Sequence, residues 1–220
     1  MLEIACFEIT SAETALASVA DRIEFCSEQS QGGLTPNIDE FRYLKSLYQK
    51  PIYVMIRPTG GSFLYSETEF QQMKKDIIQF KEAGADGFVF GILTSGNLVD
   101  TARNQELLTL AGDTPCTFHR AIDRTPDLEQ SMAALIRLGF RGVLTSGGAS
   151  TAMEGRAQLK KMVEQYANQI DIIVGEGVRS ENITALQQST NAKIFHSSAI
   201  PSYEIFANEE EIKKIRKGII

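Results

Sequence analysis

The chain contains eight short apolar runs that each end at polar residues or glycine, and most of them precede a helical stretch. A strand buried on both faces reads as a continuous apolar run, and such strands alternating with helices are typical of a parallel sheet. Eight of these units fit a closed (β/α)8 TIM barrel, whose functional side chains lie at the carboxyl ends of the strands. The runs cover residues 2–8, 22–26, 53–58, 87–93, 116–123, 142–148, 170–178 and 193–198.

A doubly wound open sheet is the competing fold, and it usually has a glycine-rich turn after its first strand. The first turn here, Glu8-Ile9-Thr10-Ser11, contains no glycine, which favours the barrel. The length of 220 residues suits one domain and is short for a TIM barrel. We therefore expect a single α/β TIM-barrel domain over residues 1–220, with an amphipathic helix in the tail at about 208–220.

The formal net charge of −6 argues against a nucleic acid or an anionic membrane as partner, because no basic surface is available to neutralise phosphates. A local basic pocket could still bind a small anion. No apolar stretch approaches the roughly 18 residues that span a bilayer. The first strand begins directly after Met1, which leaves no room for a signal peptide. These features predict a cytoplasmic protein.

The three cysteines, Cys6, Cys26 and Cys116, are an odd number and argue against a disulfide framework. Cys6 and Cys26 belong to the first two predicted strands, and neighbouring strands lie roughly 4.8 Å apart. Two thiols at one level could hold a soft ion such as Cu(I). They could equally be small buried core residues, which is the commoner role of a cysteine in a strand.

The densest polar cluster follows the fifth run, where His119, Arg120 and Asp123 supply an acid–base group, a positive charge and a carboxylate. His196, the other histidine of the chain, lies at the end of the eighth run. The ends of these two strands could face each other across the opening of the barrel. A histidine bonded to a core carbonyl is the structural alternative for each.

Arg57 lies at the end of the third run, where an unpaired guanidinium would be costly to bury. It could form a structural ion pair with Glu3 or Glu24 from neighbouring strands. It could also bind an anion, and a fork-shaped guanidinium can serve both partners.

The last three runs end in small residues and hydroxyls, which in many barrels form a pocket for an oxyanion or a phosphate. Glycines that merely allow tight turns are the structural alternative. The residues are Ser146, Gly147 and Gly148 after the sixth run, Gly175, Glu176 and Gly177 after the seventh, and His196, Ser197 and Ser198 in the eighth.

An ordered set of motifs over nearly the whole chain, to about Ala199, resembles the copper homeostasis protein CutC family. Two of the longer motifs are Ala20-Asp21-Arg22-Ile23-Glu24-Phe25-Cys26 and Thr117-Phe118-His119-Arg120-Ala121-Ile122-Asp123. The others are residues 3–6, 32–36, 55–58, 63–66, 84–91, 144–148 and 196–199. The resemblance implies a (β/α)8 barrel in the cytosol with a role in copper homeostasis. It also implies Cys6 and Cys26 as the ligands of Cu(I).

The residues support a second hypothesis, a TIM-barrel enzyme that acts on a small anionic or phosphorylated substrate by acid–base chemistry. In it His119 is the general acid–base, oriented by Glu24 or Asp123, while Arg57 and Arg120 neutralise the anion. The hydroxyl and glycine residues at the last three strand ends complete the anion-binding set. A purely structural role ranks last, because it leaves the buried Arg57 unexplained. Barrels of this size often pair, so a homodimer is possible.

Overall fold

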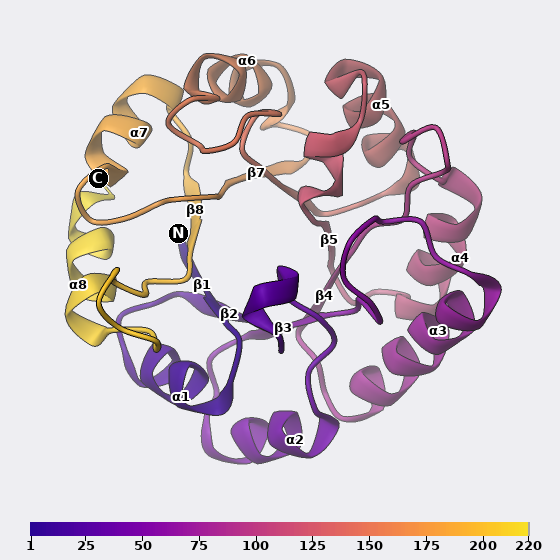
Figure 1. Ribbon diagram of the computed structural model, residues 1–220, viewed down its shortest axis with the longest axis horizontal. Coiled ribbons are helices and arrows are strands. Elements are labelled where there is room, and N and C mark those ends of the chain that lie inside the picture. Colours follow the sequence, from indigo (N-terminus) through magenta and orange to yellow (C-terminus); the bar gives the residue numbers. More distant parts are fainter. Residues whose placement is uncertain (220) are drawn as a thin grey trace.

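Eight parallel strands form a closed barrel, in which each strand pairs with the next along the chain and β8 pairs with β1 (Figure 1). The structure, a computed structural model, describes residues 1–219, and the barrel is one domain. The predicted (β/α)8 TIM barrel is therefore confirmed. The strands are β1 (Leu2–Cys6), β2 (Arg22–Phe25), β3 (Ile52–Met55), β4 (Gly87–Phe90), β5 (Cys116–Phe118), β6 (Gly142–Thr145), β7 (Asp171–Val174) and β8 (Ile194–Ser197).

The α-helices form a ring outside the strands (Figure 1). They are α1 (Ile9–Ala17), α2 (Ile38–Leu47), α3 (Glu67–Glu82), α4 (Thr101–Ala111), α5 (Leu128–Leu138), α6 (Arg156–Tyr166), α7 (Ile183–Thr190) and α8 (Glu209–Gly218). The tail expected to be helical over about 208–220 contains α8, and residue 220 lies outside the described residues. No helix in residues 1–219 has both the length and the apolar character needed to span a bilayer.

Several strands are shorter than the apolar runs that predicted them, because polar tips leave the sheet to form loops. The fifth run was expected to extend to Asp123, but β5 ends at Phe118. The imidazole of His119 accepts a hydrogen bond from the Ala121 N–H, and this contact starts the short helix η2 (Arg120–Arg124). A second short helix, η1 (Gln29–Gln31), lies over the barrel opening (Figure 1).

Side chains alternate between the two faces of each strand, and this alternation separates an outer apolar layer from the barrel interior. On β1, Ile4 and Cys6 belong to the large core cluster that includes residues of α1, whereas Glu3 lies on the other face. On β2, Phe25 pairs in register with Cys6 and belongs to the same cluster. The interior face instead carries buried polar groups, among them Glu24, and this face leads to the candidate site.

Candidate functional site

A cavity of about 630 Å³ opens at the carboxyl ends of the strands, and Gln29, Ser30 and Gln31 of η1 are part of its lining. Its size is within the range of pockets that bind small molecules. The predicted site residues that line it are Glu24, Arg57, His119, Arg120, Asp123, Glu176, Gly177, His196, Ser197 and Ser198. Among the described residues, those predicted for the site that do not line it are Cys6, Cys26, Ser146, Gly147, Gly148 and Gly175.

His119 is a buried, neutral hydrogen-bond donor. Its Nδ1 accepts the Ala121 N–H at 3.3 Å, which leaves the ring proton on Nε2. Burial, and then the positive charge of Arg57, lower the pKa of His119 to about 3. Nε2 is fully buried and has no hydrogen-bond partner among residues 1–219. The sequence prediction gave His119 a carboxylate partner, but within residues 1–219 neither Glu24 nor Asp123 bonds to it.

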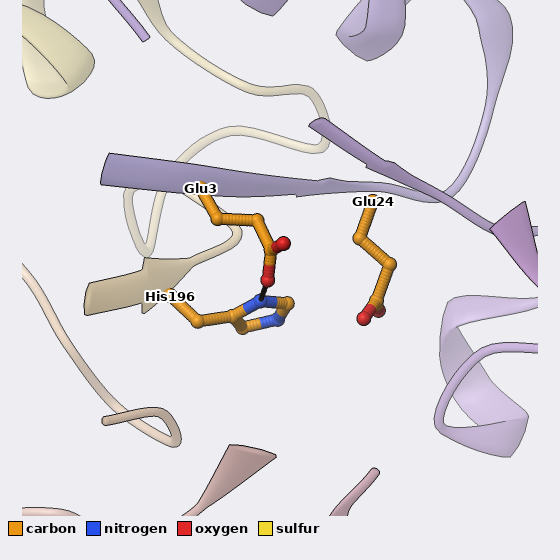
Figure 2. A group of neighbouring side chains, drawn as sticks. All are labelled: Glu3, Glu24 and His196. Carbon is orange, nitrogen blue, oxygen red and sulfur yellow. Dashed lines mark hydrogen bonds and ion pairs between the residues drawn. The ribbon is translucent and has the colours of Figure 1, made fainter. Parts of the chain in front are cut away.

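His196 and Glu3 form a hydrogen-bonded pair inside the barrel, with Nδ1 and Oε1 2.7 Å apart (Figure 2). Arg22 Nε donates to the other oxygen of Glu3. Burial would raise the pKa of Glu3, but Arg22 and then the bond from His196 outweigh it and lower this pKa to about 2. Burial would lower the pKa of His196, but the carboxylates of Glu24 and Glu3 outweigh it and raise this pKa.

Glu24 projects from β2 toward the same interior space as His196 (Figure 2). Its side chain is almost fully buried, and burial raises its pKa. Oε1 accepts a hydrogen bond from the Cys26 thiol at 3.3 Å, whereas Oε2 is buried without a hydrogen-bond partner in residues 1–219. A buried polar atom without a partner is costly, which indicates a place where a ligand atom or a proton is expected.

Donor atoms of Glu3, Glu24 and His196 lie within 4.8 Å of one another, the only such group of three in the described part of the chain. Glu3 and His196 are already bonded to each other, and the Arg22 guanidinium occupies the second oxygen of Glu3. A cation would have to displace these contacts beside a positive charge. The arrangement therefore favours a proton-carrying network over a metal centre.

Arg57 bonds to backbone carbonyl groups and not to the carboxylates that the sequence suggested. One terminal nitrogen donates to the carbonyl oxygens of Gln31 and Gly33, at 2.7 and 2.9 Å, and so holds the η1 loop. Glu3 is paired with Arg22 and His196 instead. Arg57 is buried and has no ion pair within residues 1–219, so its positive charge acts on the cavity uncompensated.

The predicted anion cradle after β6 is filled by a side chain of the protein itself. The Asp123 carboxylate accepts hydrogen bonds from the backbone N–H groups of Ser146 and Gly148, the latter at 2.9 Å. It also accepts from the Thr145 hydroxyl at 2.6 Å and from Arg120 at 3.1 Å. These N–H groups are therefore not free to bind a substrate, and Asp123 stabilises the loop after β6.

Arg120 is compensated as well, because its other nitrogens contact Glu176 and the Ser146 hydroxyl. Glu176 has a φ of 79°, in the left-handed region that a residue with a side chain rarely occupies. This ion pair joins the loop after β5 to the loop after β7. Arg120 is therefore less available to an anion than the sequence suggested.

Arg179 is a cavity residue that sequence reasoning missed. Its guanidinium donates to the hydroxyls of Ser197 and Ser198, each at 3.2 Å, and to the carbonyl of Val178. It has no carboxylate partner in the described chain. Its position could have identified it, because Arg179 directly follows the seventh apolar run and the eighth run ends in the hydroxyls of Ser197 and Ser198.

Gly175 does not line the cavity but makes room for it. A Cβ at this position would lie 2.5 Å from the Leu144 side chain and 3.4 Å from Cβ of His196. Any larger residue here would therefore push against the interior layer that holds His196. The glycine predicted as part of an anion loop is in this structure a packing requirement.

Cys6 and Cys26 lie on opposite faces of the sheet. The register pairs Cys6 with Phe25, so Cys6 points outward with Phe25 and Cys26, one residue further, points inward. The expected two-sulfur clamp therefore does not form in this structure. Cys26 shares a small buried cluster with Tyr53, Met55 and Val89. Burial raises the pKa of both thiols well above its ordinary value.

Comparisons with known proteins agree with this architecture. The copper homeostasis protein cutC homolog of Homo sapiens is 40% identical over 199 residues, covering 90% of this chain and 73% of the relative. The homolog of Caenorhabditis elegans is also 40% identical, covering 90% of this chain and 80% of that relative.

Among solved structures, the putative copper homeostasis protein CutC from Streptococcus agalactiae superimposes with a TM-score of 0.85 at 33% identity, covering 90% of this chain and 98% of that one. Thiamine phosphate pyrophosphorylase from Pyrococcus furiosus, at 14% identity, has a TM-score of 0.66 over 99% of this chain and 94% of that one, and shows a likeness of fold alone. The CutC family matches residues 1–201. The chain therefore belongs to the CutC family.

Proposed function

We propose that this protein is an enzyme that binds a small anionic substrate in the cavity at the barrel opening and acts on it by acid–base chemistry. One observation carries the proposal: Glu24 Oε2 and His119 Nε2, both buried and unpartnered in residues 1–219, belong to residues that line the same cavity. Each would gain its missing contact from a bound substrate. Burying these two polar atoms without partners destabilises the fold, so their presence is better explained by ligand binding than by stability alone.

The charges around the cavity support an anionic substrate. Arg57 and Arg179 both line it and have no carboxylate partner in the described residues, although the whole chain is acidic. Arg120 is already neutralised by Asp123 and Glu176. Arg179, together with the hydroxyl of Ser198, is the better candidate for direct contact with an anion, because Arg57 donates to two carbonyls.

Thermal stabilisation by anions tests the binding part of this proposal. A ligand that binds only the folded state raises the melting temperature with its concentration. Inorganic phosphate and glycerol phosphate are expected to stabilise the wild-type protein, and Arg179→Gln is expected to lose most of the effect. Arg42→Gln, which changes an exposed arginine on α2, is the matched control and should behave as wild type. Equal stabilisation of both variants would contradict the proposal.

Cu(I) binding is the second candidate function, and relatives named copper homeostasis protein motivate it. Cys26 and Met55 share one buried cluster inside the barrel, and thiolate and thioether sulfurs are the ligands that Cu(I) prefers. Cys6 would join them only if the end of β1 turned its side chain inward. We expect such a protein to act in the cytoplasm, where thiols stay reduced.

Competition between the reduced protein and a chromogenic Cu(I) chelator tests this candidate. Cys26→Ser and Met55→Leu should weaken binding, while Cys116→Ser, which changes a buried thiol at the start of β5, is the matched control. Loss of affinity in Cys6→Ser as well would support the two-cysteine site. Affinity that survives in Cys26→Ser, Met55→Leu and Cys6→Ser would contradict copper binding at these sulfurs. Sedimentation of the same samples measures whether the chain forms a homodimer.

A further inference from the structure

The interior of the barrel contains two histidines in opposite environments, and the proposed function leaves open which one carries the proton. His119 is neutral, its Nδ1 is occupied by the Ala121 N–H, and its Nε2 can only donate. His196 donates through Nδ1 to Glu3, which leaves its Nε2 as a lone-pair nitrogen when the ring is neutral. Its side chain is 12% exposed and lines the cavity, so Nε2 can be reached by a substrate.

Glu3 holds this tautomer in place. Its carboxylate is 1% exposed, and Arg22 on the second oxygen fixes its orientation from β2. A carboxylate that receives the Nδ1 proton orients the imidazole and stabilises the imidazolium that forms when Nε2 takes up a proton. The charged groups that face His196 are Glu3 from β1, and Glu24 and Arg22 from β2. This is the arrangement expected of a general base.

The rest of the cavity is suited to stabilising negative charge on an oxygen atom. The Nε2–H of His119 is a buried donor without an acceptor, and it lies in the field of the uncompensated Arg57 charge. Such a donor stabilises a developing oxyanion without transferring its proton. No lysine or cysteine of residues 1–219 lines the cavity, so neither an amine nor a thiolate is available there as a nucleophile.

We propose, on the basis of the proposed function, that His196 is the general base and that the substrate is a small anion with a C–H bond next to a carbonyl group. His196 Nε2 takes the proton, the C–H electron pair forms the new carbon–carbon double bond, and the carbonyl π electrons move to oxygen. The His119 N–H stabilises the resulting enolate oxygen. Return of the proton to carbon regenerates His196, so the step needs no oxidant, reductant or second reactant.

Exchange of carbon-bound hydrogen in D2O tests this step directly by proton NMR. The probes are dihydroxyacetone phosphate, ribose 5-phosphate and pyruvate, which all contain an acidic C–H and an anionic group. Wild-type protein should catalyse the exchange of at least one probe, and His196→Asn should lose roughly 10²- to 10⁴-fold of the rate. Asparagine retains a donor toward Glu3 but has no base. Glu106→Gln on the exposed side of α4 should leave the rate unchanged.

Glu3 acts through His196 and is a positioning residue, so its test is a pH profile. Glu3→Gln removes a charge that raises the pKa of His196, and the rise of the exchange rate with pH should move to lower pH. The chain has two histidines, so the His196 Cε1–H resonance can be assigned from single variants. If His196→Asn fails to fold, a shift of this wild-type resonance on probe binding, with exchange present, supports the proposal instead.

The outcomes separate the two proposals. Binding of the probes that depends on Arg179, without exchange above the background rate, would overturn the enolisation step and leave the anion pocket standing. Exchange that persists in His196→Asn would overturn the role of His196. Absence of any Arg179-dependent binding to the three probes would count against the proposed function and against this step together.

Discussion

Asp123 is expected to contribute more to stability than any other single carboxylate at the barrel opening. It accepts hydrogen bonds from two backbone N–H groups, two hydroxyls and Arg120, and its side chain is only 6% exposed. Asp123→Ala removes all of these acceptors and leaves Arg120 with one carboxylate partner, Glu176. Removing one member of such a buried network costs about 3–5 kcal/mol.

The expected loss is measurable by urea unfolding and by melting. For a chain of this length, each kcal/mol shifts the melting temperature by roughly 2–4 °C, so Asp123→Ala should melt at least about 6 °C below wild type. Formate should recover part of this loss, because its carboxylate can accept the N–H groups of Ser146 and Gly148 that the substitution exposes. Formate should stabilise the wild-type protein less than Asp123→Ala, because Asp123 already occupies these N–H groups in the wild type.

Asp127 provides the matched control, because its carboxylate accepts the Gln130 N–H at the exposed beginning of α5. Asp127→Ala should cost about 1 kcal/mol, the ordinary contribution of a helix cap, and formate should not restore it. A loss in Asp123→Ala no larger than that of the control would refute the reasoning. Equal stabilisation of the wild type, Asp123→Ala and Asp127→Ala by formate would refute the interpretation that Asp123 occupies the N–H groups after β6.

Three further perturbations follow from the geometry. In Gly91→Ala the new Cβ would lie 2.8 Å from His119 Nδ1, so urea unfolding should show a loss of about 1–3 kcal/mol, whereas Gly96→Ala, with its nearest neighbour at 3.9 Å, should cost less than about 1 kcal/mol. Arg57→Lys keeps the positive charge but loses the guanidinium that donates to the Gln31 and Gly33 carbonyls, so amide hydrogen exchange in residues 29–33 should accelerate. Unchanged exchange in these residues would contradict a role of Arg57 in holding the η1 loop. The pKa of His119 is lowered to about 3 in the folded protein, so between about pH 6.5 and pH 3 only the unfolded chain is protonated at this residue. The free energy of unfolding should therefore fall as the pH falls through this range, and it should fall less steeply in His119→Gln.

The sequence was sufficient to predict the barrel because its information is local and repeated. Each apolar run is short, each ends at a polar tip, and glycines such as Gly84 and Gly139 follow helices where the chain must turn back into a strand. The capping box at Ser66 and Glu69 also forms as the spacing indicates. Such signals act over a few residues, so they can be read without knowing what lies next to them in space.

The contacts within the site depend on register and on loops that meet far from each other in sequence. Alternation places Cys6 on one face of its own strand, but only the pairing of Cys6 with Phe25 shows that Cys26 lies on the other face. Asp123 and Gly148 are 25 residues apart, and nothing in either motif indicates that the Asp123 carboxylate accepts the Gly148 N–H. A carboxylate that completes a backbone cradle therefore reads, in sequence, like a catalytic acid.

The two histidines show why residue type alone could not assign the chemistry. Burial and then the positive charge of Arg57 lower the pKa of His119, whereas the carboxylates of Glu24 and Glu3 outweigh burial and raise the pKa of His196. Two titratable groups whose environments separate their pKa values are a common basis for acid–base function in one pocket. This separation supports the proposed step, in which neutral His119 donates a hydrogen bond to an oxygen atom and His196 takes up a proton.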